Sequence, residues 1–197
     1  MNDEEILENK NTFLSHLATW CRRDGINALV NYLENETDFF TAPASTKYHL
    51  CEEGGLCEHS LNVFDRMEDF YKHDHEDNIK MENCAIVSLL HDVCKANFYA
   101  VEYRNRKNEK TGLWEKYPVY IVNDDFPYGH GEKSVYIISK FIKLTDEEAL
   151  AIRWHMGGFD CAVKGGEYAC AKAFEQNSLA VWLHCADILA TYIDERD

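Results

Sequence analysis

The stretch MENCAIVSLLHDVCK, residues 81–95, runs from a continuous apolar segment into a histidine, an aspartate and a lysine. Its length and apolar character predict a buried helix over 81–94. Neighbouring helical residues project about 100° apart, so His91 and Asp92 can both face a groove between helices. Burying a histidine and a carboxylate costs free energy unless they find partners. The stretch therefore marks a place where a functional site is expected.

Three other ionisable residues fall on or beside apolar helix faces far along the chain. His59 belongs to a predicted amphipathic helix over 56–71. His155 ends a helix that opens with a capping-box pattern, and Asp187 lies in the last predicted helix, 178–193. A shared cation is the simplest joint explanation for these burials. Imidazole nitrogens and carboxylate oxygens suit Zn, Mn, Fe or Mg-class ions.

The remaining sequence also favours helices, with one exception. Apolar residues at helical spacing predict helices over 4–20, 25–34 and 132–143. Within 98–122, aromatic and β-branched residues alternate with polar ones on both sides of a turn segment, 108–112. This pattern predicts a β-hairpin in a mainly α protein. The tip of the hairpin gathers the basic residues Arg104, Arg106, Lys107, Lys110 and Lys116.

The composition restricts the class of protein. With 46% apolar residues over 197 positions, the chain can bury a sizeable core. Its formal charge of −15 argues against a long nucleic acid as partner, because binding to a phosphate backbone depends on a basic surface. An acidic protein can still bind phosphates where metal dications supply the positive charge.

The cysteine and targeting patterns favour a cytoplasmic protein. No run approaches the roughly 20 apolar residues of a membrane span, and residues 1–11 are acidic where an export signal would be basic and then apolar. None of the eight cysteines forms a CxxC pair, and Cys57 and Cys94 are expected to pack as small hydrophobes. We therefore expect a reduced protein without a membrane partner.

Five segments in order resemble the HD-domain phosphohydrolase superfamily. They are GGLCEHSLNV (54–63), SLLHDVCK (88–95), GHGEKS (129–134), RWHMGG (153–158) and LHCADILA (183–190). The ordered pattern H…HD…D is the defining feature of that family, and 32, 38, 25 and 32 residues separate the successive sites. The segments are most similar to the exoribonuclease-like members, without their nucleic-acid-binding module. The resemblance implies one HD-type domain over 1–197, with N-terminal helices in 1–45, a helical-bundle core in 46–192 and the hairpin inserted at 98–122.

The resemblance also implies the metal ligands. By position, the residues that match the family's ligands are His59, His91, Asp92 and Asp187. His130 and His155 match two further histidines of branches that hold a second metal, in which Asp92 would bridge the ions. If only one ion binds, these two histidines would contact the phosphate or transfer a proton. The expected cofactors are one or two divalent ions of the Mn, Fe, Zn, Ni or Mg class.

Several residues have two interpretations. Lys95 either supports Asp92 or contacts a phosphate, or it is a solvated lysine whose positive charge interacts favourably with the helix dipole at a C-terminus. Arg153 clamps a phosphate bidentately or lies at the surface. His184, one turn before Asp187, is a candidate partner of a ligand.

The role of the basic residues on the hairpin also has two interpretations. Arg104, Arg106 and Lys107 form a rim that recruits an anionic substrate, or they are solvated charges.

These features together predict hydrolysis of a phosphate ester or diester by metal-activated water, with Asp92, Lys95, His130 and His155 in the chemistry. The expected substrate is a small phosphorylated molecule, a nucleotide or short oligonucleotide. The alternative is a catalytically silent HD module that binds a nucleotide as a sensor. The sequence leaves the substrate, the metal and the oligomeric state open.

Overall fold

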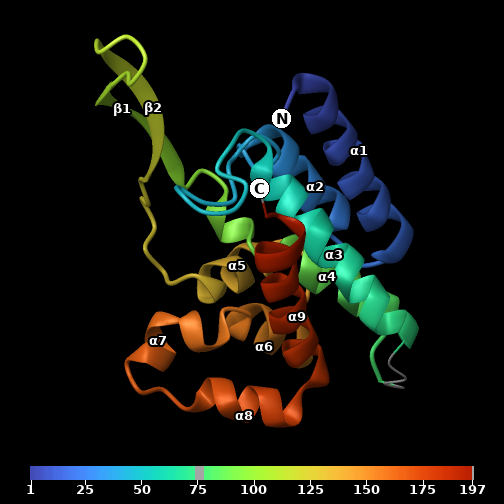
Figure 1. Ribbon diagram of the computed structural model, residues 1–197. Helices are drawn as coiled ribbons and strands as arrows, with labels where there is room; N and C mark the ends of the chain where they lie inside the picture. Colours follow the sequence, from blue (N-terminus) through green and yellow to red (C-terminus); the bar gives the residue numbers. More distant parts are fainter. Residues whose placement is uncertain (74–77, 197) are drawn as a thin grey trace.

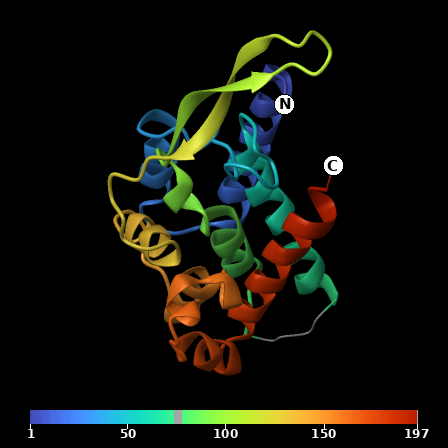
Figure 2. The same cartoon turned by 60° about the vertical axis from the view of Figure 1, so that its left-hand side comes forward.

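A bundle of helices forms the body of the molecule, and a two-stranded hairpin projects from it in the computed structural model (Figures 1 and 2). The structure describes residues 1–73 and 78–196. The helices are α1 (Asp3–Trp20), α2 (Ile26–Asn35), α3 (Gly55–His73), α4 (Met81–Leu90), α5 (Gly131–Ile138), α6 (Asp146–Trp154), α7 (Cys161–Lys164), α8 (Ala169–Gln176) and α9 (Ser178–Leu189). Short helical turns are η1 (Val93–Lys95), η2 (Gly157–Phe159) and η3 (Ala190–Asp194), and the strands are β1 (Tyr99–Lys107) and β2 (Trp114–Val122).

Helix α4 lies at the centre of the bundle. Nearly all of its side chains are buried, from Met81 to Leu90, and α1, α3, α6 and α9 pack around it. A helix that is apolar on every side has no face to present to water, so it takes the central place. The sequence from 81 therefore positions the residues that follow it, His91 and Asp92, inside the protein.

An ion pair between a half-buried arginine and a buried glutamate fixes α6 against the N-terminal helices. The predicted capping box is present, because Thr145 Oγ1 accepts from the backbone of Glu148 at 3.2 Å and Glu148 Oε2 accepts from that of Thr145 at 2.9 Å. Glu148 is fully buried and also receives both terminal nitrogens of Arg23 at 2.6 and 2.7 Å. This bidentate contact connects the α1–α2 turn to α6, the helix that His155 follows.

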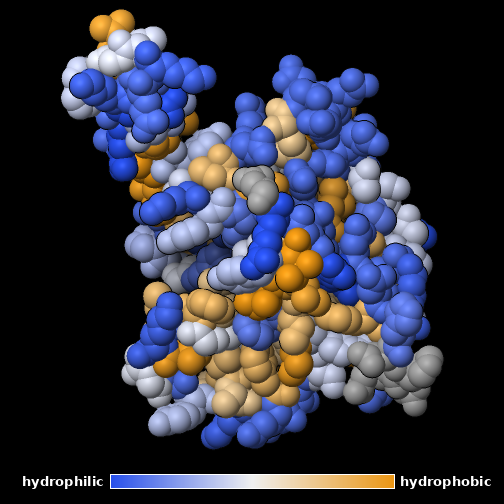
Figure 3. Space-filling view, in the orientation of Figure 1, coloured by the Kyte–Doolittle hydropathy of each residue, from blue (hydrophilic) through white to orange (hydrophobic). Residues whose placement is uncertain are grey.

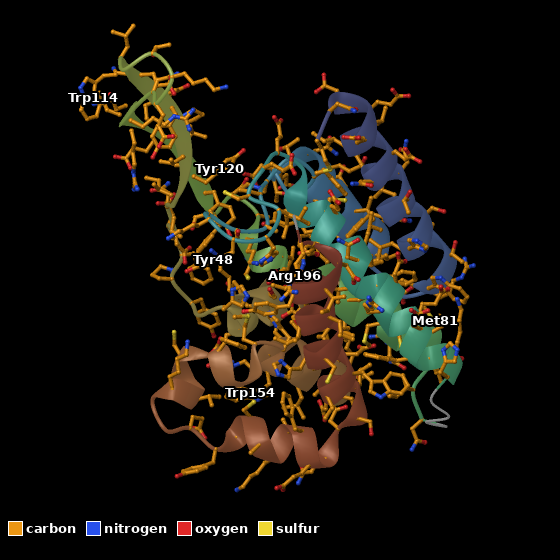
Figure 4. All side chains as sticks on the ribbon, in the orientation of Figure 1. Tyr48, Met81, Trp114, Tyr120, Trp154 and Arg196 are labelled. Carbon is orange, nitrogen blue, oxygen red and sulfur yellow. The ribbon has the colours of Figure 1, made fainter. Side chains whose placement is uncertain are left out.

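The predicted hairpin is confirmed. Its strands pair antiparallel from Tyr99↔Val122 to Lys107↔Trp114. The end near Tyr99 lies against the bundle, since the hydroxyl of this residue donates to the Ala44 carbonyl at 3.2 Å. The outer part is exposed, and the side chain of Trp114 stands at the tip (Figure 4).

Two predicted helices are shorter than expected, and two short helices were missed. The central helix ends at Leu90 rather than at residue 94, because Asp92 leaves the helical conformation before the 3₁₀ turn η1. The helix predicted over 132–143 ends at Ile138, and α7 and α8 were not predicted. Among the described residues, none of the helices has both the length and the apolar content to traverse a bilayer.

Candidate metal centre

Six predicted ligands converge from five parts of the fold. His59 lies within α3 and Asp187 within α9, whereas the other four stand at or just beyond helix ends. Those four are His91 after α4, Asp92 before η1, His130 before α5 and His155 after α6. The distances in the next two paragraphs link all six side chains into one cluster. The predicted convergence of residues distant along the chain is therefore present in the structure.

One group of ligand atoms surrounds Oδ2 of Asp92. His59 Nε2 lies 3.3 Å from His91 Nε2 and 3.3 Å from Asp187 Oδ1. The same Asp92 oxygen lies 3.7 Å from His59 Nε2 and 3.5 Å from His91 Nε2. Donor atoms that share one ion at its usual bond lengths are about 3.0–3.5 Å apart. The spacing in this group fits a common cation.

A second group surrounds the other oxygen of the same carboxylate. Asp92 Oδ1 lies 2.9 Å from His130 Nε2 and 3.6 Å from His155 Nε2. Cys94, expected only to pack, also takes part, because its Sγ lies 3.3 Å from His130 Nδ1. The two oxygens of Asp92 thus face different pairs of histidines, as a carboxylate between two ions would.

Backbone carbonyls orient two of the imidazoles. Nδ1 of His91 donates to the carbonyl of Ser88 and Nδ1 of His155 to that of Ile152, both at 2.7 Å. Because a carbonyl can only accept, the proton is on Nδ1. In the neutral ring Nε2 then carries the free electron pair that a metal needs. Burial lowers the pKa of His91 to about 4, which keeps this ring neutral at ordinary pH.

His184 contacts the site through the backbone. Its Nδ1 donates to the His155 carbonyl at 2.6 Å, so it supports this segment without touching a ligand side chain. The close approach depends on Gly157, whose φ is +50° and where an added Cβ would lie 2.5 Å from the His184 ring. A side chain there would displace His184.

Unpartnered polar atoms provide an independent test of whether a cation fits. Asp92 Oδ1, His130 Nε2 and His155 Nε2 are buried and make no hydrogen bond of good geometry. Buried polar atoms are nearly always paired in folded proteins. Since these three atoms converge on one point of the site, a cation between them would satisfy all three.

The carboxylates carry negative charge into this interior. Burial acts to raise the pKa of Asp92, but Lys95, His91 and His130 outweigh it and hold that pKa well below its usual range. Burial likewise opposes the charge on Asp187, and its contact with His59 lowers the pKa nonetheless. Both side chains are therefore ionised and able to bind a cation.

The centre opens into a cleft of about 770 Å³. Asp92, Lys95, His130 and Asp187 contribute its charged floor. The rest of its lining comes from Tyr48, His49, Met156, Phe159, Lys164, Ile188, Thr191, Tyr192 and Glu195. Hydrophobic residues also gather near the last turns of α9 on the surface in Figure 3, whereas α1 and most of the hairpin are hydrophilic. The cleft therefore combines a charged floor with largely apolar walls.

Lys95 reaches the centre, and the predicted arginines do not. Lys95 Nζ lies 2.6 Å from Asp92 Oδ2 and lines the cleft. Arg153 binds Glu132 at 2.5 Å and Asp160 at 2.9 Å, and its guanidinium lies over the Trp154 ring. The guanidinium therefore braces neighbouring segments and does not line the cleft.

The hairpin cations lie away from the cleft lining as well. Arg106 pairs with Glu115 across the strands at 2.7 Å, and Arg104 lies 3.5 Å from Glu102. Lys107 is exposed on β1. A direct contact between these residues and a molecule in the cleft has no support from their positions.

Sequence reasoning missed two residues that approach His59. His49 comes from an irregular segment without periodicity, and Glu195 follows the last predicted helix. Glu195 Oε1 lies 2.9 Å from His59 Nδ1. Neither position carried a pattern that could have indicated a site.

The fold and the centre define a helical protein with a buried cluster of imidazole and carboxylate groups that could hold divalent ions. A family model described as HD domain matches residues 56–192, which include all six clustered residues. The chain belongs to the HD domain family, whose members are generally metal-dependent hydrolases. No curated protein and no solved structure gave a significant match.

Proposed function

We propose that the protein is a metal-dependent phosphohydrolase that cleaves a phosphate ester or diester of a nucleotide or short oligonucleotide. The main support is the placement of Asp92. Its two oxygens face separate histidine pairs, and Lys95 contacts one of them. This arrangement is at the floor of a cleft that is open to a substrate.

The residues present divide into two ligand sets. His59, His91 and Asp187 would hold one ion with Asp92 Oδ2, and His130 and His155 would hold the other with Oδ1. When bound, such ions would lower the pKa of a water molecule toward about 7 and offset charge on the phosphoryl oxygens.

Lys95 supplies a fixed positive charge beside the reacting phosphoryl group. Burial acts to lower the pKa of its ammonium, but Asp92 outweighs this effect and raises it, so Lys95 stays protonated. The ammonium orients Asp92 through its 2.6 Å contact and faces the cleft. Charge that is already in place where negative charge develops lowers the barrier without further reorganisation.

His130 is suited to proton transfer if it is not bound to an ion. Its side chain is 29% exposed and lines the cleft, so a substrate oxygen can reach it. Burial acts to lower its pKa, but Cys94 and Asp92 outweigh that effect and raise the pKa well above the usual value. A protonated His130 could donate to the leaving oxygen.

The walls of the cleft favour a substrate with a flat organic group. A phosphoryl group on the floor would leave most of the volume to Tyr48, Phe159 and Tyr192, which are exposed. Bases stack on aromatic side chains with about 1–3 kcal/mol each. Lys164, whose Nζ lies 5.9 Å from the Phe159 ring centroid, stands where it could bind a further phosphate.

The test is phosphate release by metal-loaded protein over a panel of mononucleotides, cyclic nucleotides, nucleoside triphosphates and dinucleotides. Mn²⁺, Zn²⁺, Fe²⁺, Ni²⁺ and Mg²⁺ would be compared, and Asp92→Asn is the inactive variant. Asp146→Asn, which removes an acid from the first turn of α6 away from the cleft lining, is the matched control. We expect release by the wild type and the control, and none by Asp92→Asn. Nucleotide binding without turnover under every metal would replace the proposal with a sensor module.

A further inference from the structure

The two nitrogens of His59 have different surroundings. Nε2 faces the candidate metal centre, where Asp187 Oδ1 is 3.3 Å away. Nδ1 points to the opposite side, where Glu195 Oε1 lies at 2.9 Å. Asn62, less than one turn further along α3, donates its side-chain amide to the same oxygen at 3.0 Å. His59 therefore connects the centre to a carboxylate outside it.

Glu195 lies beyond the family match, which ends at residue 192. It reaches His59 because α9 changes to the π-helical turn η3, in which Glu195 N–H donates to the Ala190 carbonyl at 3.0 Å. In a continuous α-helix, Asp187 and Glu195 would be offset by about 80° around the axis. A π turn rotates less per residue, which reduces this offset and brings both carboxylates to His59.

The carboxylate of Glu195 is almost fully buried, with 1% of the side chain exposed. Burying a carboxylate is costly unless it is hydrogen bonded or paired. Oε1 of Glu195 already accepts the side-chain amide of Asn62, so it acts as an acceptor at this position. The 2.9 Å contact is therefore a donation from Nδ1 of His59, and the proton lies on that nitrogen.

We infer that Glu195 is a positioning residue that fixes the ring of His59 and leaves its Nε2 free to bind a metal. Histidines that bind metals commonly donate their other N–H to a carboxylate, which sets the tautomer and raises the basicity of the ligand. A segment outside the family match would thus complete the centre. The inference rests on the proposed metal centre and not on the identity of the substrate.

A metal held by His49, His59 and Glu195 is the competing interpretation, since their ligand atoms lie within 4.8 Å of one another. His49 Nε2 is 4.0 Å from Glu195 Oε2, and its ring centroid is 5.0 Å from that of His59. An ion there would require His59 to lose its Nδ1 proton while its Nε2 binds the ion shared with His91 and Asp187. The hydrogen bond to Glu195 requires no such loss, so we assign the contact to positioning.

The experiment compares Glu195→Ala and Glu195→Gln with the matched control Asp194→Ala. Asp194 is the preceding acid in the same turn, but it pairs with Arg66 at the surface and does not touch His59. Zinc affinity would be measured by competition with a chelating indicator. The Nδ1 proton resonance of His59 would be followed by NMR in ¹⁵N-histidine protein, both metal-free and zinc-loaded.

We expect Glu195→Ala to weaken zinc binding by about 10- to 100-fold and to remove or shift the hydrogen-bonded Nδ1 proton of His59. Glu195→Gln should recover part of the affinity, because its amide oxygen can still accept. Asp194→Ala should stay within about threefold of the wild type, since surface ion pairs contribute little.

Two results would overturn the inference. One is an unchanged His59 resonance in Glu195→Ala together with zinc affinity within about twofold of the wild type. The other is an equal loss in Asp194→Ala, which would assign the effect to anchoring of the C-terminal turn. If the wild type binds none of Zn²⁺, Mn²⁺, Fe²⁺, Ni²⁺ and Mg²⁺, the proposed function fails, and the Nδ1 resonance of the metal-free protein still decides whether Glu195 orients His59.

Discussion

The candidate metal centre and the hairpin both gather charged residues, but their environments differ. In the centre, His59, His91 and Asp92 are at most 2% exposed and have mainly one another as polar neighbours. On the hairpin, the side chains of Arg104 and Arg106 are 58% and 62% exposed. Water satisfies the hairpin charges, whereas only a ligand would satisfy the unpartnered atoms of the centre. A cluster of charges therefore indicates chemistry where burial excludes water.

Aromatic side chains show the same contrast. Phe13, Phe39 and Phe64 are essentially fully buried in the bundle, whereas Trp114 on the hairpin is 72% exposed. Tyr120 lies closer to the bundle and is only partly exposed (Figure 4). The alternation that predicted the strands was correct, yet it did not predict burial, because two strands alone offer no second layer to cover a face.

The largest expected effect concerns the centre. Replacing His91 and Asp92 together with Ala should remove bound metal and reduce turnover by at least about a thousandfold, since single stabilising groups already contribute 10²–10³. Elemental analysis and phosphate release would be measured on the same preparation, and circular dichroism would report folding. Retained metal and turnover would show that the buried charges are structural.

Lys95→Ala should have the next largest effect. The variant loses the charge beside Asp92, and we expect kcat to fall about 100-fold while metal content stays close to the wild type. Lys140→Ala, which removes a lysine from above the Tyr136 ring away from the cleft, is the control. An unchanged kcat would show that Lys95 has no role in turnover, like the solvated charges of the hairpin.

Metal binding should depend on pH through His59. Burial acts to lower its pKa, but the bonds to Asp187 and Glu195 outweigh this effect and raise the pKa to about 10. In the metal-free protein the ring is thus protonated below about pH 10, and binding must release that proton. Affinity should rise with pH toward this value.

Calorimetry in buffers with different ionisation enthalpies would measure the released protons at pH 7. His59→Ala should lose the part of the buffer dependence that comes from this ring, together with affinity, whereas the proton released from His130, whose pKa is also raised, should remain. A binding enthalpy that does not vary with the buffer would contradict the proton assignment.

The smallest effect is expected at the hairpin. Arg106→Ser with Lys107→Ser should raise KM about two- to threefold and weaken its salt dependence, because these charges act only by long-range attraction. Metal content and kcat should not change. A KM equal to that of the wild type at low salt would remove the hairpin from substrate capture altogether.

The parts of the fold that the sequence predicted well have strong local patterns. Helix α3 was expected over 56–71 and spans Gly55–His73, and the hairpin lies within its predicted limits. The convergence of six residues was also predicted, because their burial and order along the chain agreed with a family pattern. The metal-binding role of those residues stays a prediction.

The inaccuracies have physical reasons. Arg153 lies near the centre in sequence, but Asp160 and Glu132 compete for its guanidinium, and no local pattern reveals such tertiary partners. Glu195 depends on a π turn, which sequence periodicity does not register. Contacts that arise from the ends of elements were therefore harder to predict than the elements themselves.

Anomalous X-ray scattering from crystals grown with Mn²⁺ or Zn²⁺ locates bound ions without reference to any activity. If Asp92 holds a divalent cation, we expect an anomalous peak in contact with Asp92 Oδ2, His59, His91 and Asp187. At full metal loading we expect a second peak beside Asp92 Oδ1, His130 and His155. Crystals that show peaks only at surface acids, with none in contact with Asp92, would contradict a metal centre in this protein.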